Sequence, residues 1–327
     1  MIKTPKFCIG PMSKEVVDTV IDYYNDTGRA IWFIPSRRQV EWDGGYVNNW
    51  TTYGFCSYVR KRSKNNLIMR DHGGPHQGAV IDIGYSSISA DAMMMDGIHV
   101  DPWKKYREIE DAANCTSEII RFCSRTNGNL FFEIGTEQGI REMSVDEMER
   151  FILLVRDKLK GTFDRVEYFV IQSGTGLKEN HNTGKYDTSK LADMTSLCKK
   201  YGLKSKEHNG DYLSSDAVSA RFDGGLDTIN IAPEFGYIQT KLILSEIKGN
   251  EELFEKMFDV CLSSKKWCKW VGEDFNPNDR KEELIKICGH YVFSDQEIVK
   301  ITRSIDNFED KVKTVLRARL DELYSGV

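Results

Sequence analysis

One stretch of the sequence, NNLIMRDHGGPHQG at residues 65–78, sets an acid and an imidazole shortly after an apolar run. The apolar residues 67–69 lead through Asp71 and His72 into a glycine pair, which lets another group approach the backbone closely. A carboxylate and an imidazole together suit zinc or a related divalent ion, and a carboxylate beside such an ion can move a proton. Two interpretations follow. Either His72 hydrogen-bonds the turn at residues 73–75, or a ligand site lies at the end of a strand.

Similar side chains close most of the other strand-like segments. They are Gln39, His99, Asp101, Glu133, Glu137, Gln172, Glu207, His208, Asp211, Asn230 and Glu234. Burying such groups without partners would cost roughly several kcal/mol each, so their recurrence predicts a shared site. In that site Asp71 is the candidate for proton transfer and Asn230 the candidate for holding the substrate. The further candidates for substrate binding are Gln39, Asp101, Gln172 and Asp211.

Several of these residues also have a purely structural interpretation. His99 and Asp101 alternate along one strand and so face the same side. For His99 we favour a buried, hydrogen-bonded core histidine. Glu133 lies among the apolar residues 131–134, so a buried structural ion pair is the alternative to a role near a metal. The remaining histidines, His76, His181 and His290, are assigned no metal role.

The segments that must position these residues alternate between strand-like and helical patterns. Eight strand-like runs occupy residues 6–12, 30–35, 66–70, 94–100, 129–134, 166–172, 203–208 and 226–232. Helical spacing occupies residues 14–27, 110–126, 144–160, 188–201 and 235–247, with a capping box predicted at Ser144 and Glu147. This alternation is typical of parallel βαβ units, and eight of them predict a closed α/β (β/α)₈ TIM barrel. The alternative, a doubly wound open sheet, lacks a G-x-G-x-x-G motif after its first strand.

In a barrel of this kind, reactive side chains stand at the carboxyl ends of the strands, where the candidates lie. We expect a single (β/α)₈ barrel domain over residues 1–327, with its strands within about 6–234. A C-terminal helical extension over 248–327 is expected to pack on the barrel, with helices at 251–271 and 295–324. It would cover one end of the barrel or contribute to a subunit interface.

Composition excludes several classes of function. The formal net charge of −5 and the absence of a basic cluster argue against nucleic-acid binding. No apolar run approaches the roughly 20 residues of a membrane-spanning helix. The eight cysteines are scattered without a CxxC pair, which favours reduced, mostly buried thiols. The first residues lack the apolar stretch of a signal peptide, so we expect a cytoplasmic protein.

Several motifs resemble the tagatose-bisphosphate aldolase accessory-subunit family, in the family's order and over most of the chain. They are FIPSRRQVEWDGGYVNNWTTYGF at 33–55, RDHGGP at 70–75, DGIHVDPW at 96–103, EIGTEQG at 133–139, EHNGDYL at 207–213 and HYVFSDQEI at 290–298. That family is related to the class II, metal-dependent ketose-bisphosphate aldolases. INIAPEF at 229–235 is similar to the stretch that ends their eighth strand.

The resemblance implies roles for five residues. His72 and His208 fall where two metal-binding histidines lie, and the implied ion is divalent, with Zn²⁺ favoured. Asp71 falls on the proton-transferring aspartate, Asn230 on the substrate-binding asparagine, and Glu133 on a catalytic-site glutamate near the metal.

Two positions depart from these patterns. The sixth strand ends in Gln172, where the aldolases have a third histidine and the accessory family also has glutamine. In the tail, Gln296 stands where the accessory family has an arginine after Ser-Asp. The first departure bears on metal binding and aldol cleavage, and the second on recognition of a phosphate.

The resemblance therefore predicts an enzyme of carbohydrate metabolism, an epimerase or aldolase that acts on a ketose or ketose phosphate by retro-aldol and enediolate chemistry. The alternative is a non-catalytic accessory subunit that stabilises or activates a separate class II tagatose-bisphosphate aldolase. A sugar-binding barrel without turnover is a third hypothesis. The expected partners are a small-molecule sugar or sugar phosphate, together with either a second copy of the chain or a catalytic aldolase subunit.

Overall fold

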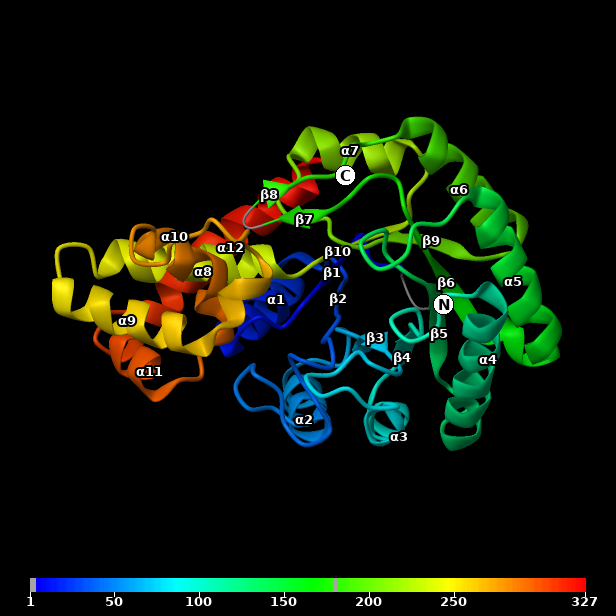
Figure 1. The fold of residues 1–327 in the computed structure, drawn as a ribbon, viewed down its shortest axis with the longest axis horizontal. Helices are drawn as coiled ribbons and strands as arrows, with labels where there is room; N and C mark the ends of the chain where they lie inside the picture. Colours follow the sequence, from blue (N-terminus) through cyan, green and yellow to red (C-terminus); the bar gives the residue numbers. More distant parts are fainter. Residues whose placement is uncertain (1–3, 179–180) are drawn as a thin grey trace.

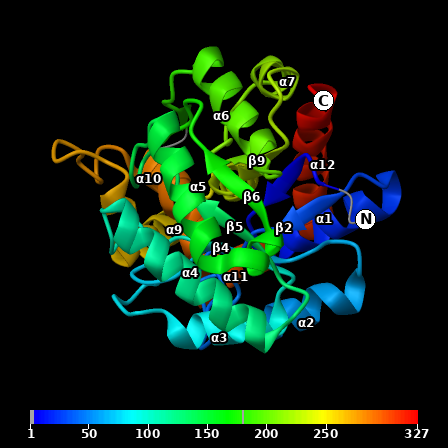
Figure 2. The same cartoon turned by 90° about the vertical axis from the view of Figure 1, so that its right-hand side faces the viewer.

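The computed structural model describes residues 4–178 and 181–327 and contains an eight-stranded parallel sheet that closes into a barrel (Figures 1 and 2). The order around the sheet is β2-β1-β10-β9-β6-β5-β4-β3, and the bridges Phe33–Ile68 and Ser36–Asp71 join its two ends. The strands are β1 Phe7–Ile9, β2 Ile31–Phe33, β3 Met69–Gly73, β4 Gly97–Val100, β5 Phe131–Gly135, β6 Val166–Ile171, β9 Lys204–Glu207 and β10 Thr228–Ile231. A separate hairpin consists of β7 Leu177–Lys178 and β8 His181–Asn182.

Helices follow the strands and surround the barrel (Figure 1). They are α1 Lys14–Thr27, α2 Thr52–Arg62, α3 Tyr85–Met94, α4 Ile109–Thr126, α5 Val145–Leu159, α6 Thr188–Lys200, α7 Ser215–Asp223 and α8 Pro233–Glu246. Side-chain caps fix several helix starts. Ser13 accepts from the Val16 N–H before α1, and Ser144 and Glu147 form the predicted capping box before α5. The (β/α)₈ barrel predicted from the sequence is confirmed.

The differences from the predicted elements have local causes. The strand predicted at 66–70 is β3 at Met69–Gly73, so Asp71 and His72 belong to the strand itself. The helices α2, α3 and α7 were not predicted, because their sequences mix polar and apolar residues without a clear apolar face. The helix predicted at 251–271 ends at Ser264, where Lys265 adopts a left-handed φ of 53°.

The tail contains four α-helices: α9 Glu251–Ser264, α10 Lys281–Cys288, α11 Gln296–Arg303 and α12 Phe308–Ser325. α12 packs against α1, α7 and α8, and Figure 2 shows it in red beside the blue α1. α9 packs against α10 and α11, and these three helices form a group at the left of Figure 1. Between α10 and α11 a short 3₁₀ helix, η3 Gly289–Tyr291, contacts α8. That residues 1–327 form one domain stays a prediction.

The inside of the barrel is apolar at one level and polar at the next. A cluster separate from the main core is formed by Cys8, Trp32, Ile34, Met69, Phe131 and Tyr168. Since side chains two residues apart on a strand share a face, Met69 is followed inside the barrel by Asp71, and Phe131 by Glu133. The polar level lies toward the carboxyl ends of the strands. The alternation in the sequence thus delivers charged groups to the barrel mouth.

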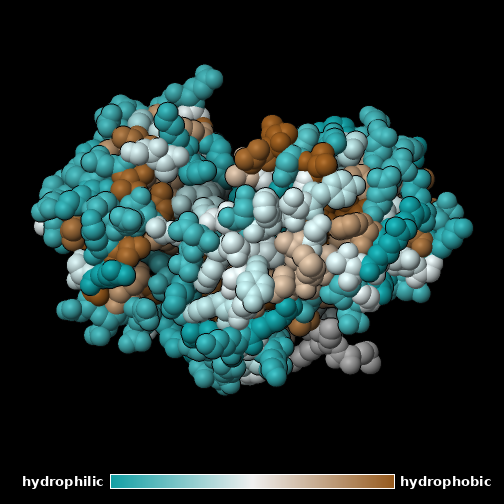
Figure 3. Space-filling view, turned by 90° about the horizontal axis from the view of Figure 1, so that it is seen from below, coloured by the Kyte–Doolittle hydropathy of each residue, from teal (hydrophilic) through white to brown (hydrophobic). Residues whose placement is uncertain are grey.

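The outer surface over α2 and α3 mixes hydrophilic side chains with side chains of intermediate hydropathy (Figure 3). Seen from below, teal hydrophilic side chains occupy much of the outline and strongly apolar ones lie in small separate groups (Figure 3). Exposed apolar residues of the chain include Val80, Ile81 and Ile83, which lie between β3 and α3. These three lie within four consecutive residues and so form one local apolar group. Among the described residues, no helix is long and apolar enough to cross a membrane.

Candidate metal centre and active site

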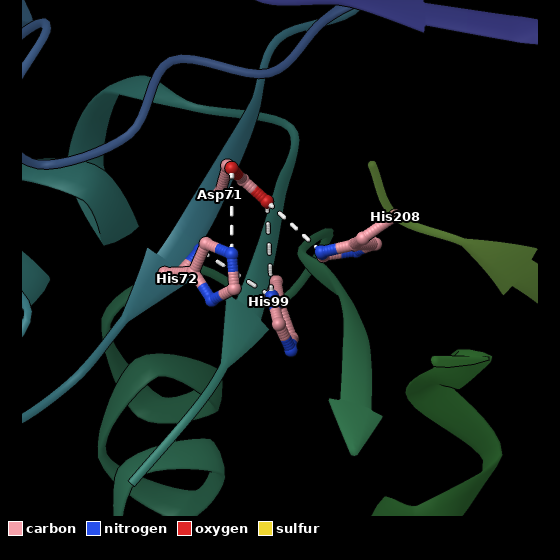
Figure 4. Close-up of side chains that lie close together, drawn as sticks. All are labelled: Asp71, His72, His99 and His208. Atoms are coloured by element: carbon pink, nitrogen blue, oxygen red, sulfur yellow. Dashed lines mark hydrogen bonds and ion pairs between the residues drawn. The ribbon is translucent and has the colours of Figure 1, made fainter. Parts of the chain in front are cut away.

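Three histidines and one aspartate converge at the carboxyl ends of β3, β4 and β9 (Figure 4). Asp71, His72, His99 and His208 each place one ligand atom within 4.8 Å of the others. Asp71 Oδ1 lies 3.9 Å from His99 Nδ1 and 3.7 Å from His208 Nδ1, and Asp71 Oδ2 lies 3.8 Å from His72 Nε2. This cluster includes His72 and His208, the two residues proposed as metal ligands from the sequence.

In each imidazole the nitrogen that faces away from the cluster has an acceptor. His72 Nδ1 lies 2.6 Å from Asp101 Oδ2, His99 Nε2 lies 3.1 Å from Gly135 O, and His208 Nε2 lies 2.7 Å from Glu133 Oε1. A carboxylate or carbonyl oxygen can only accept, so these outer nitrogens carry a hydrogen, and the inner nitrogens are the ones that can offer a lone pair to a metal ion when the rings are neutral. Metal-binding histidines are usually fixed in this way by an outer acceptor. The donor set therefore fits a divalent metal ion.

The backbone supports the same arrangement. His72 has a positive φ of 48°, and its N–H points toward His99 Nδ1 at 3.3 Å, which agrees with a lone pair on that atom. A non-glycine residue in the left-handed region carries backbone strain, and such strain is concentrated at functional sites. The Cα partners His99 and Glu133 lie side by side on β4 and β5. The strand register thus brings the acceptor of His208 next to His99.

The electrostatics of the cluster favour positive charge at its centre. Burial would raise the pKa of Asp71, but His72, His99 and His208 outweigh it and lower that pKa. Burial would lower the pKa of His72, but Asp71, Asp101 and Glu137 raise it to about 10. A position that holds a proton so strongly also attracts a metal cation, and the two compete for the same lone pair.

Glu133 lies one level deeper than the histidines. Its Oε1 accepts from His208, and its Oε2 lies 2.6 Å from Lys206 Nζ, with neither Glu133 nor Lys206 exposing any side-chain surface. Burial would raise the pKa of Glu133, but Lys206, His99 and His208 lower it to about 2. The ion pair weighed as its structural alternative is thus present, and the same carboxylate orients a candidate metal ligand.

A cavity of about 220 Å³ opens beside the cluster. Asp71, His72 and His208 line it, together with Asn230, whose buried Oδ1 has no hydrogen-bond partner among the described residues. All four side chains proposed from the sequence as metal ligands (His72 and His208), proton carrier (Asp71) and substrate holder (Asn230) thus line one cavity. His99 lies deeper and does not line it.

The four residues proposed for substrate binding fall into two groups. Gln39 and Asp211 line the cavity, and each also accepts from backbone N–H groups: Gln39 from Ser36, and Asp211 from Ala232 and Glu234. Asp101 and Gln172 do not line it. Asp101 accepts from Thr136 as well as His72. The amide of Gln172 binds three backbone groups, Met143 N, Thr136 O and Arg141 O.

Sequence reasoning did not place His99 in the metal cluster. His99 is indeed buried and hydrogen-bonded, as expected of a core histidine, but its second nitrogen faces Asp71. The third histidine therefore comes from β4, and Gln172 on the sixth strand of the barrel holds the backbone instead. The alternation of His99 with Asp101 was the available signal. This alternation indicates that His99 and Asp101 share one face of the strand, but it does not indicate how close His99 lies to His72.

Basic side chains gather at the outer part of the cavity. Arg38, Lys104 and Lys269 all line it, and none of them has an ion-pair partner within 4 Å among the described residues. Partial burial, together with Arg38 and Lys104, lowers the pKa of Lys269 to about 8. Lys269 comes from the C-terminal extension, which sequence reasoning did not connect with the site. A cavity with metal-type donors inside and cations outside suits an anionic, oxygen-rich ligand.

Comparison with solved structures identifies the fold class. Over 99% of this chain and all of that chain, it is similar to a protein from Sinorhizobium meliloti 1021 described as a probable tagatose 6 phosphate kinase (TM-score 0.80, 14% identity). It is also similar to the fructuronate-tagaturonate epimerase UxaE from Cohnella laeviribosi (TM-score 0.64, 11% identity, 98% of this chain and 81% of that chain). A third similar structure is the YdjI aldolase from Escherichia coli K12 (TM-score 0.56, 12% identity, 94% of each chain).

At these identities the similarity establishes a (β/α)₈ barrel and not an activity. No protein-family model matches the chain, and no curated protein matches it by sequence. The chemistry of this protein is therefore set by the residues of its own cavity.

Proposed function

We propose that this protein is a metal-dependent enzyme that acts on a ketose or ketose phosphate, as a 4-epimerase or an aldolase. The observation that carries the proposal is the orientation of His72, His99 and His208. Each has one nitrogen held by an acceptor outside the cluster, and the group places one ligand atom per residue within 4.8 Å of those of the others and of Asp71. Such a set favours zinc, and a zinc ion bound there would polarise a substrate carbonyl.

Asp71 is the proposed acid and base. Its low pKa keeps it a carboxylate, and its Oδ1 is buried without a hydrogen-bond partner among the described residues. In retro-aldol cleavage of a ketose, this carboxylate accepts the proton of the C4 hydroxyl as the C3–C4 bond breaks. The electron pair of that bond moves toward the C2 carbonyl, giving an enediolate and an aldehyde. Rotation of the aldehyde, re-formation of the C3–C4 bond on its other face and return of the proton to the C4 oxygen give the C4 epimer. Protonation of the enediolate at C3, followed by release of both fragments, gives net cleavage.

Other side chains of the cavity position the substrate. Asn230 presents an unpaired amide oxygen to it, which suits a hydroxyl of the sugar. Arg38, Lys104 and Lys269 suit a phosphate or carboxylate at the far end of the molecule. Two proteins with this fold are described as an epimerase of fructuronate and tagaturonate and as an aldolase, which supports the proposed reaction class.

The test is turnover by the metal-loaded protein on a panel of ketoses, ketose phosphates and ketonic uronates. The panel includes tagatose 6-phosphate and fructuronate, and both epimerised and cleaved products are measured. We expect the protein to convert at least one member of the panel, and to lose that activity when a chelator removes the metal ion. A protein that converts none of them, but accelerates a separate aldolase, would be the accessory subunit instead.

A further inference from the structure

Two side chains of the cavity that lie outside the proposed reaction are buried without complete hydrogen bonding. Gln77 Oε1 has no partner, and neither ring nitrogen of His290 has one, among the described residues. Both residues line the cavity that Asp71 and His72 also line, and each is 3% exposed. Buried polar groups are almost always hydrogen-bonded, so unpaired ones that face a cavity indicate a bound partner from outside the chain.

Steric contacts fix the position of His290. It lies in η3, and a Cβ added to Gly236 of α8 would come within 2.5 Å of the His290 Cβ. Its ring lies against Tyr291, with 4.0 Å between ring centroids, and near Tyr46 at 6.5 Å. The imidazole is therefore held by packing, and neither of its nitrogens is hydrogen-bonded to another described residue.

The protonation state of His290 sets what it can bind. Burial, with a smaller contribution from Lys269, lowers its pKa to about 3, so the ring is neutral near pH 7. A neutral imidazole offers one N–H donor and one acceptor nitrogen. Gln77 adds an acceptor in a fixed place, because its Nε2 donates to Asp101 O at 2.9 Å.

A sugar hydroxyl is both a donor and an acceptor, and a ketose carries several of them in a row. We propose that His290 and Gln77 bind hydroxyl groups of the substrate, so that the C-terminal extension completes the sugar-binding wall of the barrel. This inference rests on the sugar substrate of the proposed function, but not on the reaction. It gives η3 a role in choosing which ketose is bound.

The experiment is calorimetric binding of tagatose 6-phosphate and of tagaturonate to the metal-loaded protein. The tighter of the two is then compared with analogues that each lack one hydroxyl. We expect His290→Phe, which keeps a ring and removes both nitrogens, to bind the parent sugar about tenfold more weakly. His290→Phe should also stop discriminating against one of the analogues that wild type binds weakly. His290→Gln, which keeps a donor and an acceptor, should recover part of the loss.

The matched control is His181→Phe, since His181 is exposed on β8 and does not line the cavity. It should bind every sugar as wild type does. If His290→Phe does not fold, as judged by circular dichroism, the same comparison is made with His290→Gln, which should show a smaller loss at the same hydroxyl.

The inference is overturned if wild type binds neither sugar, or if the His290 variant that folds keeps both the affinity and the discrimination of wild type. Because binding is measured instead of turnover, the two proposals can fail separately. A protein whose sugar affinity depends on His290, but which converts neither sugar, would contradict the proposed reaction and support this inference.

Discussion

Buried charged groups are paired within the chain in the level of the barrel below the histidines. In the cavity beside the histidines, several buried polar atoms are unpaired within the described part of the chain. Below, Glu133 is bound at both ends, by His208 and by Lys206, and no side-chain surface of the pair is exposed. In the cavity, Asp71, Asn230 and His290 keep buried atoms without a hydrogen-bond partner among the described residues. The first region pairs its buried charges within the chain. In the second, we propose that a ligand pairs with the buried polar atoms.

The difference separates residues that position from residues that react. Glu133, Asp101 and the carbonyl of Gly135 each hold the outer nitrogen of one histidine. They make the inner lone pairs converge without facing the substrate. If the two regions had been assigned the wrong way round, changes in the cavity would mainly reduce stability, and changes in the level below it would mainly reduce turnover.

The largest expected effect is on catalysis, from Asp71→Asn. Asparagine is nearly isosteric but cannot accept the proton, so turnover should fall by roughly 10²–10⁴-fold, the usual contribution of general acid–base catalysis. Folding and sugar binding should be retained. Initial rates on whichever panel member wild type converts would check this. An Asp71→Asn protein as fast as wild type would remove Asp71 from the reaction.

The second effect is on stability, from Lys206→Met. It leaves the buried Glu133 without its cation, so the free energy of unfolding should fall by roughly 3–5 kcal/mol. The double variant Glu133→Gln, Lys206→Met should be less destabilised than Lys206→Met alone, because no buried charge is then left uncompensated. Chemical denaturation measures both.

The control for that pair is Lys200→Met, which breaks the ion pair of Lys200 with Glu149 on the surface. Solvent screens such a pair, so stability should change little. Equal losses from Lys206→Met and Lys200→Met would mean that the deep ion pair does not support the barrel.

The smallest effect is expected at the rim of the cavity. Lys104→Met should weaken binding of tagatose 6-phosphate by about fivefold or less, and the loss should shrink as salt is added. Lys105→Met is the matched control, because its neighbouring side chain does not line the cavity. If both variants bind the phosphorylated sugar alike, Lys104 does not contact its anionic end.

The sequence predicted the fold, and it named some of the residues that meet in the candidate site, for physical reasons. Eight strand-like runs, seven of them with apolar residues and several separated by helical spacing, favour a closed barrel, and strand-end polarity marked Asp71, His72 and His208. The sequence alone does not give the distances between side chains on different strands. His99 and Lys206 differ from ordinary buried residues only through neighbours on other strands.

The C-terminal extension shows the same limit more strongly. His290 is more than 200 residues away from Gln77 in the chain, yet both line one cavity. Helical periodicity in the tail predicted helices, but it contains nothing that says which part of the barrel they cover. The contact between η3 and α8 determines which part of the barrel the tail covers. Gly236 of α8 allows this contact, because a side chain there would clash with His290.

The central claim is that three oriented histidines hold one divalent ion, and elemental analysis of purified protein tests it most directly. Wild type and His181→Ala should each contain about one divalent ion per chain. His72→Ala, His99→Ala and His208→Ala, folded as judged by circular dichroism, should each retain far less after dialysis against a weak chelator. The same metal content in all five proteins, or none in wild type supplied with zinc, would contradict the account.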